Sequence, residues 1–148
     1  MSRMPYVKTE LVMRGSKQAI YDVIRDMVSY PKFMKNLESV KILEQDENTD
    51  LTHWVSNVDG RKIVWTERDF FYPDDFRITY SQTEGDLKKM EGAWELETVP
   101  DGVRVSLAVD FEFGIPMIAG LLNPILVRKV KENSNAMLQA VKAQVEQA

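Results

Sequence analysis

The chain has 148 residues, of which 44% are hydrophobic and 28% charged, with a net charge of −4 and a pI of about 5.1. This length suits one domain spanning residues 1–148, and the composition is that of a globular protein rather than a disordered or membrane-spanning one. The acidic balance argues against nucleic-acid binding, which depends on basic residues that neutralise phosphates. The chain has no cysteine, which excludes disulfides, thiolate metal sites and cysteine nucleophiles.

Targeting signals are missing from the sequence. No apolar run reaches the roughly 20 residues that a membrane-spanning helix needs, so we expect no stable membrane insertion. Residues 1–10 lack the apolar core of a secretory signal, and we therefore expect a cytoplasmic protein.

The first quarter of the chain predicts a strand followed by two helices. Residues 6–13 alternate as a strand, and Ser16 is a suitable N-cap for the next element. Residues 19–27 carry apolar side chains at three- and four-residue spacing, which indicates an amphipathic helix that Pro31 should stop. Apolar residues within 30–37 predict a short second helix.

Between residues 39 and 113 the pattern changes to period two, with many β-branched and aromatic residues. We predict six strands, at residues 39–46, 50–58, 61–72, 75–83, 89–99 and 102–113. Asp59-Gly60 and Asp101-Gly102 are hairpin signals, and Pro73-Asp74-Asp75 is a turn. Strands joined by such short turns pair in antiparallel order.

A long helix is predicted at the C-terminus. Asn123 is a suitable N-cap and Pro124 suits the first helical position. The apolar stripe of this helix is interrupted by Asn133, which needs a hydrogen-bond partner if it is buried.

This order of elements predicts an α+β fold of the helix-grip kind. A seven-stranded curved antiparallel sheet would wrap around the long C-terminal helix, with two short helices between strands 1 and 2. A twisted sheet and one helix do not fill space completely. The gap between them becomes either a packed core or a pocket.

Three parts of the chain carry a family resemblance: SYPKFMKNLESVKIL at residues 29–43, EGDLKKMEGAWEL at 84–96 with the strand ending DFEF at 110–113, and ENSN at 132–135. They resemble the polyketide cyclase/dehydrase and coenzyme Q-binding families of the START-like (SRPBCC) superfamily. The resemblance covers essentially the whole chain. It implies a helix-grip fold and a cavity for a lipid, a quinone or a polyketide-like molecule, since members include cyclases, lipid carriers and ubiquinone binders.

Arg68 is the candidate catalytic residue. By alternation it shares a strand face with Thr66 and Phe70, whereas Trp65 and Glu67 share the other face. The resemblance implies that an arginine at this position lies inside the cavity of aromatic polyketide cyclases, where it could polarise a carbonyl. The alternative is a surface arginine paired with a neighbouring acid.

The sequence offers no clear side chain for the acid or the base that a cyclase reaction needs. The resemblance implies a tyrosine in the helix corner as the acid of the cyclases, but Leu37 occupies the matching position. Tyr30 is nearby, and the family implies that it is an aromatic wall. The single histidine, His53, suits an exposed or packed side chain better than a base.

The remaining candidate residues are aromatic, sulfur-containing or apolar side chains suited to a flat or isoprenoid ligand. For each of them, ordinary core packing is the alternative, and for Asn133 the alternative is a satisfied core asparagine. The predicted ligand-binding residues are Tyr30, Met34, Leu37, Trp54, Arg68, Tyr80, Met90, Trp94, Phe111, Phe113, Met117, Asn133 and Met137.

These observations favour a non-catalytic carrier or binding protein for a hydrophobic small molecule. An aromatase/cyclase acting on an aromatic polyketide-like substrate is the alternative. A third interpretation is a domain that acts on another macromolecule, as relatives resembling ribosome-binding toxins do, and the acidic pI disfavours it. With no glycine-rich phosphate loop, paired histidines or Ser-His-Asp set, we predict no cofactor and no metal.

Overall fold

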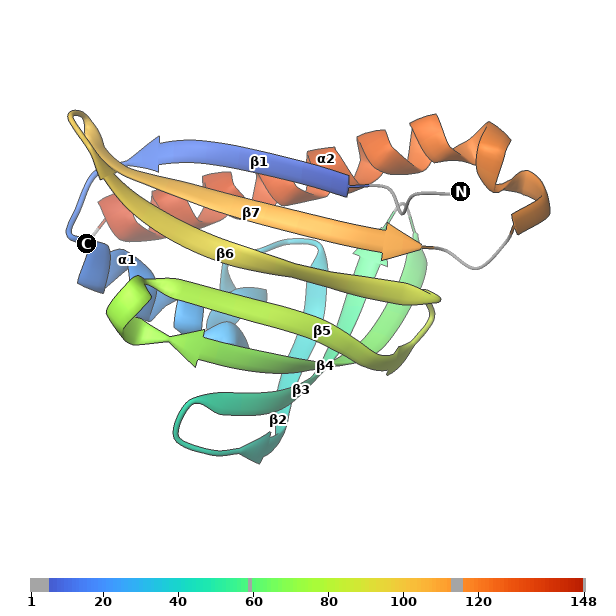
Figure 1. Ribbon diagram of the computed structural model, residues 1–148, viewed down its shortest axis with the longest axis horizontal. Coiled ribbons are helices and arrows are strands. Elements are labelled where there is room, and N and C mark those ends of the chain that lie inside the picture. Colours follow the sequence, from blue (N-terminus) through green and yellow to red (C-terminus); the bar gives the residue numbers. More distant parts are fainter. Residues whose placement is uncertain (1–5, 59, 113–115, 148) are drawn as a thin grey trace.

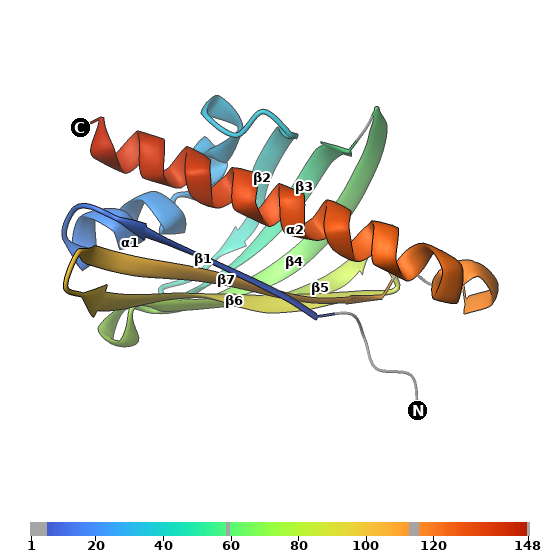
Figure 2. The same cartoon turned by 90° about the horizontal axis from the view of Figure 1, so that it is seen from above.

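Seven strands account for about half of the chain: β1 (Tyr6–Met13), β2 (Leu37–Gln45), β3 (Thr49–Val58), β4 (Arg61–Tyr72), β5 (Arg77–Gly85), β6 (Lys89–Val99) and β7 (Gly102–Glu112). The computed structural model describes residues 6–58, 60–112 and 116–147, and within the last range the side chains of 124, 125 and 127–147. All neighbouring strands pair antiparallel, in the order β1-β7-β6-β5-β4-β3-β2. The long helix α2 (Pro116–Glu146) lies across the concave face of this curved sheet (Figures 1 and 2). The predicted helix-grip fold is confirmed.

Two short helical elements connect β1 to β2, which form opposite edges of the sheet. Helix α1 (Lys17–Arg25) is capped as predicted, because the Ser16 hydroxyl accepts a hydrogen bond from the Ala19 amide at 3.1 Å. The second element, η1 (Met27–Lys32), is a 3₁₀ helix that contains Pro31. The predicted extension of this helix to residue 37 is wrong, because Leu37 already pairs with Ser56 at the start of β2.

The long helix begins earlier than the sequence predicts. It starts at Pro116 rather than at Pro124, which lies inside it. The Asn123-Pro124 pair has the composition of a helix start, yet a proline within a helix removes only one backbone hydrogen bond and bends the helix rather than ending it. The 31 residues of α2 extend about 46 Å at about 1.5 Å per residue. Within the described ranges, no helix is long and apolar enough to cross a membrane.

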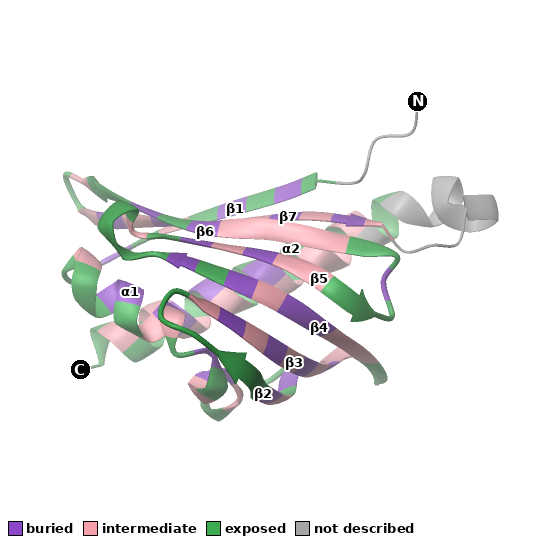
Figure 3. Cartoon of the chain, turned by 60° about the horizontal axis from the view of Figure 1, so that its bottom comes forward, coloured by how far each residue is buried: buried purple, intermediate pink, exposed green. Residues whose placement is uncertain are grey.

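Along the strands, buried residues alternate with more exposed ones, as the period-two pattern predicts (Figure 3). On β7, alternate residues form a buried face, since Val103, Val105, Leu107 and Val109 all point into the core. On β5 the predicted bounds of 75–83 are shifted by two residues. The reason is a 3₁₀ turn, η2 (Pro73–Asp75), which is followed by a left-handed residue, Phe76 at φ 49°.

Helix α2 does not cover the whole concave face. It packs mainly against β1 and α1 and only lightly against β7. Leu138 and Val141 of α2 are fully buried in this contact. The inner surfaces of β3 to β6 are therefore left to be covered by their own side chains.

Gly92 on β6 leaves room for the side chain of Tyr80, on β5, to reach across β6 to β7. The Tyr80 hydroxyl donates a hydrogen bond to the Ala108 carbonyl oxygen on β7 at 2.8 Å. A Cβ atom at position 92 would lie 1.9 Å from that carbonyl oxygen and 2.5 Å from the Tyr80 hydroxyl oxygen. A glycine is therefore required where these three strands meet.

We expect Gly92→Ala to lower the free energy of unfolding by about 3 kcal/mol, the upper end of the cost of overpacking, because the obstacle is backbone. Urea unfolding measures it. Gly60→Ala is the matched control: it has φ 84° but open space around it, so it should lose only about 1 kcal/mol through backbone strain. Equal losses in the two variants would show that Tyr80 does not need this gap.

Candidate functional site

A cavity of about 500 Å³ lies between the concave face of the sheet and α2. Its wall is largely aromatic and aliphatic, with side chains from β2 to β7 on one side and from α2 on the other. Among the residues predicted from the sequence, those that line it are Leu37, Trp54, Tyr80, Met90, Trp94, Phe111, Asn133 and Met137. The fold therefore brings most of the predicted ligand-binding residues together.

The cavity runs along β4 from an open end to a closed one. Arg61 is exposed, Ile63 and Trp65 are half-buried, and Glu67 is only 3% exposed. Arg61 and Glu67 are six residues apart on the strand, a distance of about 20 Å at about 3.3 Å per residue. We call the end at Arg61 the mouth and the end at Glu67 the floor. Lys129 of α2 also lines the cavity, and Ile125, 47% exposed, marks its solvent side.

Some predicted residues do not line the cavity. Tyr30 and Met34 are buried behind its wall, where the Tyr30 ring packs edge-to-face against Trp54 and Trp94 at centroid distances of 5.7 and 6.3 Å. The Tyr30 hydroxyl donates to the backbone carbonyl of Ile24. Tyr30 therefore supports the wall and is not a free acid. Phe113 and the side chain of Met117 lie outside the described residues.

The prediction that Arg68 lies inside the cavity is wrong. Trp65 and Glu67 face inward, so Arg68 points to the convex side of the sheet. There it forms an ion pair with Glu44 of β2 at 3.2 Å, with 32% of its side chain exposed. His53 also faces outward, and its Nδ1 lies 3.0 Å from the Thr66 hydroxyl oxygen. Neither residue reaches the cavity.

Asn133 interrupts the apolar stripe of α2 as expected and lines the cavity. Its Oδ1 accepts a hydrogen bond from the Asn36 side chain at 3.2 Å, and its Nδ2 makes a long contact of 3.8 Å with Met137 Sδ. Asn133 thus ties α2 to the segment before β2. Its partner is neither Arg68 nor another charged group.

The floor of the cavity holds a pair of buried carboxyl groups that the sequence interpretation missed. Glu67 and Asp69 follow each other on the inward face of β4, and Asp69 is fully buried. Their side chains share a hydrogen bond. Asp69 Oδ2 also accepts one from the Thr52 hydroxyl at 2.6 Å, whereas its Oδ1 finds no N–H or hydroxyl donor among the described residues. A proton on Glu67 would supply the donor that Asp69 Oδ1 lacks.

The pKa values agree with this assignment of the proton. Burial, and then the neighbouring Asp69 carboxylate, raise the pKa of Glu67 well above its ordinary value of 4.5. Burial also raises the pKa of Asp69, but its hydrogen bonds with Glu67 and Thr52 oppose the rise. Glu67 is thus the member that keeps the proton. The phenols of Tyr30 and Tyr80, which face the pair from η1 and β5, have raised pKa values chiefly through burial and remain neutral.

Two stacked tryptophans hold the carboxyl pair through hydrogen bonds to Glu67 and Thr52. The Trp65 indole N–H donates to Glu67 Oε1 at 2.8 Å, and the Trp54 indole N–H donates to the Thr52 hydroxyl oxygen at 2.8 Å. The two indoles stack at 5.5 Å with an interplanar angle of 10°. The carboxyl pair is therefore held by hydrogen bonds on both sides and by a stacked aromatic wall.

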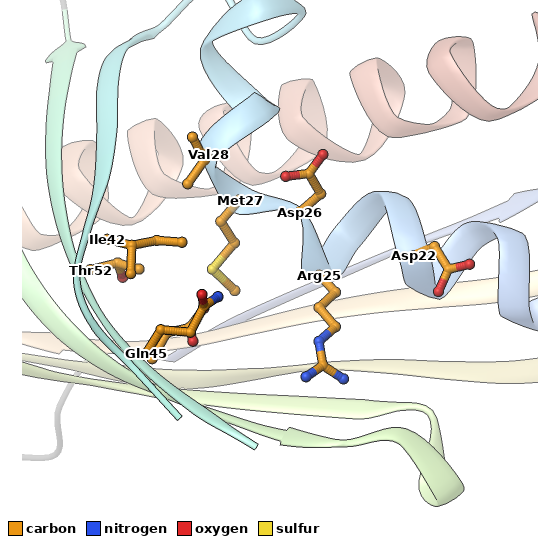
Figure 4. Close-up of a pocket in the computed structure, with 9 residues that line it drawn as sticks. Asp22, Arg25, Asp26, Met27, Val28, Ile42, Gln45 and Thr52 are labelled. Carbon is orange, nitrogen blue, oxygen red and sulfur yellow. The ribbon is translucent and has the colours of Figure 1, made fainter. Parts of the chain in front are cut away.

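A smaller hollow of about 260 Å³ lies between α1, η1 and the strands β2 and β3 (Figure 4). The carboxylates of Asp22 and Asp26 lie apart in this view and do not converge on a common point. Arg25 is already engaged, donating to the Glu47 carbonyl oxygen at 3.0 Å and stacking 4.4 Å from the Phe71 ring centroid. This hollow offers no convergent set of binding groups.

Comparison with known proteins places the chain in a family. The model of the family described as polyketide cyclase/dehydrase and lipid transport matches residues 14–138. The chain belongs to this family. The resemblance seen in the sequence is thereby confirmed.

Individual members and structural neighbours differ in what they are named for. The ribosome association toxin RatA of Vibrio cholerae serotype O1 is 24% identical over 144 residues, covering 94% of this chain and 96% of the toxin. The solved structure of TTHA0849 from Thermus thermophilus has a TM-score of 0.90 and 25% identity, covering 95% and 97% of the two chains. The Zhui aromatase/cyclase from Streptomyces sp. R1128 shares the fold, with a TM-score of 0.86, 24% identity and coverage of 97% and 94%.

For this member of the family, the carboxyl pair makes stability depend on pH. The folded chain holds a proton on Glu67 that the unfolded chain releases above about pH 4.5. The stability linked to this proton is complete below that pH and is lost as pH rises toward the folded pKa, by up to about 1.4 kcal/mol per unit. Glu67→Gln keeps the shape, the charge of the pair and both hydrogen bonds, but does not titrate. We expect this variant to gain stability relative to wild type from pH 4.5 to pH 8, measured by urea unfolding.

Glu95→Gln, which alters an exposed carboxyl on β6, is the control and should show no such trend. A flat difference between Glu67→Gln and wild type across this range would mean that Glu67 ionises in the folded chain much as it does in the unfolded one.

Proposed function

We propose that the chain binds a hydrophobic small molecule in the cavity between its sheet and α2, as a carrier or binding protein working in the cytoplasm. The observation that carries the proposal is the cavity of about 500 Å³, lined mainly by aromatic and aliphatic side chains. Ligand sites in proteins typically have volumes of about 300–1,000 Å³ and apolar walls with a few polar groups. A lipid, a quinone or a polyketide-like molecule has the matching chemistry.

The polarity of the wall supports an amphipathic ligand that enters from one end. Arg61 and Lys129 lie toward the mouth, whereas the stacked Trp54 and Trp65 and the carboxyl of Glu67 line the inner part. Met90 and Met137 add flexible thioethers that adapt to irregular ligands. An apolar body would lie inside, with any acidic group near the mouth.

The aromatase/cyclase alternative has less support. It relied on Arg68 to polarise a carbonyl, but Arg68 pairs with Glu44 on the convex face. Tyr30, the nearby phenol, donates to a backbone carbonyl. Binding without turnover needs neither residue. The family description includes lipid transport as well as cyclisation, which agrees with a carrier.

Filling the cavity from the helix side tests the proposal. Val130 of α2 lines the cavity, and Lys131 beside it is exposed. We expect Val130→Trp to weaken binding of the neutral dye N-phenyl-1-naphthylamine at least tenfold, because the indole would occupy the ligand's space; dye fluorescence measures it. Lys131→Trp and Arg68→Ala are the controls and should bind like wild type. Equal binding by Val130→Trp and Lys131→Trp would exclude this cavity as the site.

The relatives named ribosome association toxins favour a second candidate function, binding to the ribosome. The net charge of −4 opposes contact with ribosomal RNA, so such binding would rely on ribosomal proteins. We expect the purified chain to stay in the supernatant when sedimented with bacterial ribosomes at about physiological salt. Co-sedimentation that Val130→Trp leaves unchanged would make the ribosome the partner and the cavity incidental.

A further inference from the structure

The hydrogen-bond donors next to the Glu67–Asp69 pair are used within the protein. The Glu67 proton goes to Asp69, and the Tyr80 hydroxyl goes to the Ala108 carbonyl oxygen. The same holds for four hydroxyl and indole groups of β3 and β4. Thr52 donates to Asp69, and Trp54 donates to Thr52. Ser56 donates to the Ile63 carbonyl oxygen, and Trp65 donates to Glu67.

What the floor still offers is acceptor capacity. Each carboxyl oxygen has two lone pairs, and Glu67 Oε1 accepts only one hydrogen bond, from Trp65. Because Glu67 is hydrogen-bonded to Asp69, an ionised Asp69 places negative charge directly behind Glu67 at the inner end of the site. Glu67 donates its own proton to Asp69, and such a chain of hydrogen bonds strengthens Glu67 as an acceptor. A ligand group that donates is therefore favoured beside Glu67, and a group that only accepts gains no hydrogen bond from the Glu67 acceptor oxygen.

From this geometry we propose that Glu67 accepts a hydrogen bond from a hydroxyl group at the inner end of a flat aromatic ligand. The cavity would thus select phenols and related hydroxylated aromatic molecules over their ethers. This inference rests on the proposed function, because it assumes that the cavity binds a small molecule. It adds the chemical class of the ligand and its orientation.

The shape of the floor supports a flat ligand. The stacked indoles of Trp54 and Trp65 form a planar surface beside Glu67, and Trp94 and Phe111 also line the cavity. Aromatic rings pack favourably in offset or edge-on contact with such a surface.

The charge of a ligand's polar group decides how well it fits the floor, and a neutral hydroxyl fits better than a charged group. A ligand carboxylate at the floor would meet the negative pair and be repelled, whereas Arg61 suits it at the mouth. An ammonium group would be attracted to the pair but would lose its hydration, and the desolvation cost of a buried ion pair can exceed the Coulombic gain. A neutral donor with an apolar body fits both ends.

Two probes that differ only in the donor test the inference: 2-naphthol and 2-methoxynaphthalene, with dissociation constants from isothermal titration calorimetry. The wild type should bind 2-naphthol about tenfold tighter, although the ether has more apolar surface, because only the naphthol donates. In Glu67→Met, which keeps the size of the side chain but removes the acceptor, this preference should fall to about one. Glu67→Gln should retain most of it, since its amide oxygen accepts and its amide N–H can donate to Asp69.

The outcomes separate this inference from the proposed function. Equal affinities of the wild type for the two probes would overturn the role of Glu67 and leave the cavity as a binding site. Binding of neither probe would overturn both. If Glu67→Met does not fold because Asp69 is left buried without its proton donor, Glu67→Met with Asp69→Asn removes the charge as well. A preference that survives in that double variant would also overturn the role of Glu67.

Discussion

A single helix has to cover the concave face of a seven-stranded sheet, and it is too narrow to do so. The cavity and its lining follow from this difference in width. The sheet twists and curls, as antiparallel sheets of this size do. Helix α2 can pack closely on only part of it, mainly β1 and the neighbouring α1. Large side chains from β3 to β6 fill some of the remaining space, and the rest is the cavity of about 500 Å³. The cavity is thus a consequence of the architecture, and the wall residues determine its chemistry.

Placing two carboxyl groups in that wall is costly unless they are neutralised or hydrogen-bonded. Glu67 and Asp69 reduce the cost by sharing one proton, and Thr52 and Trp65 supply further donors. A network of this kind in a low-dielectric interior stabilises its own geometry but leaves little donor capacity for anything else. Buried ionisable groups with strongly altered pKa values at a cavity are candidates for a functional site. In the proposed binding mode, the groups that make the floor rigid would also make it selective.

Strand β4 shows why the site was only partly predictable. Period two assigns Arg68 and Glu67 to opposite faces, but it does not say which face is inward. The inward face contains two acids, whereas the outward face contains Phe70 and Tyr72, both more than 40% exposed. The inward face also carries Ile63, Trp65 and Phe71, so composition along this strand does not single out either face. The missed signal was the ordered series Ile63, Trp65, Glu67, which continues the inward aromatic and aliphatic pattern of the neighbouring strands.

The amino-acid sequence by itself determined the order of the elements, the antiparallel strands with most of their bounds, and the long apolar helix stripe. These features depend on local periodicity and turn residues, which act over a few positions. It also indicated most of the aromatic and sulfur side chains of the cavity wall, because Trp54, Trp94 and Phe111 are too large and apolar to be left in water. Only the tertiary structure decided that Arg68 faces solvent, that Tyr30 lies behind the wall, and that Glu67 and Asp69 share a proton beside two stacked indoles. Those outcomes depend on which strand face meets α2 and on contacts between strands, and no local pattern contains that information.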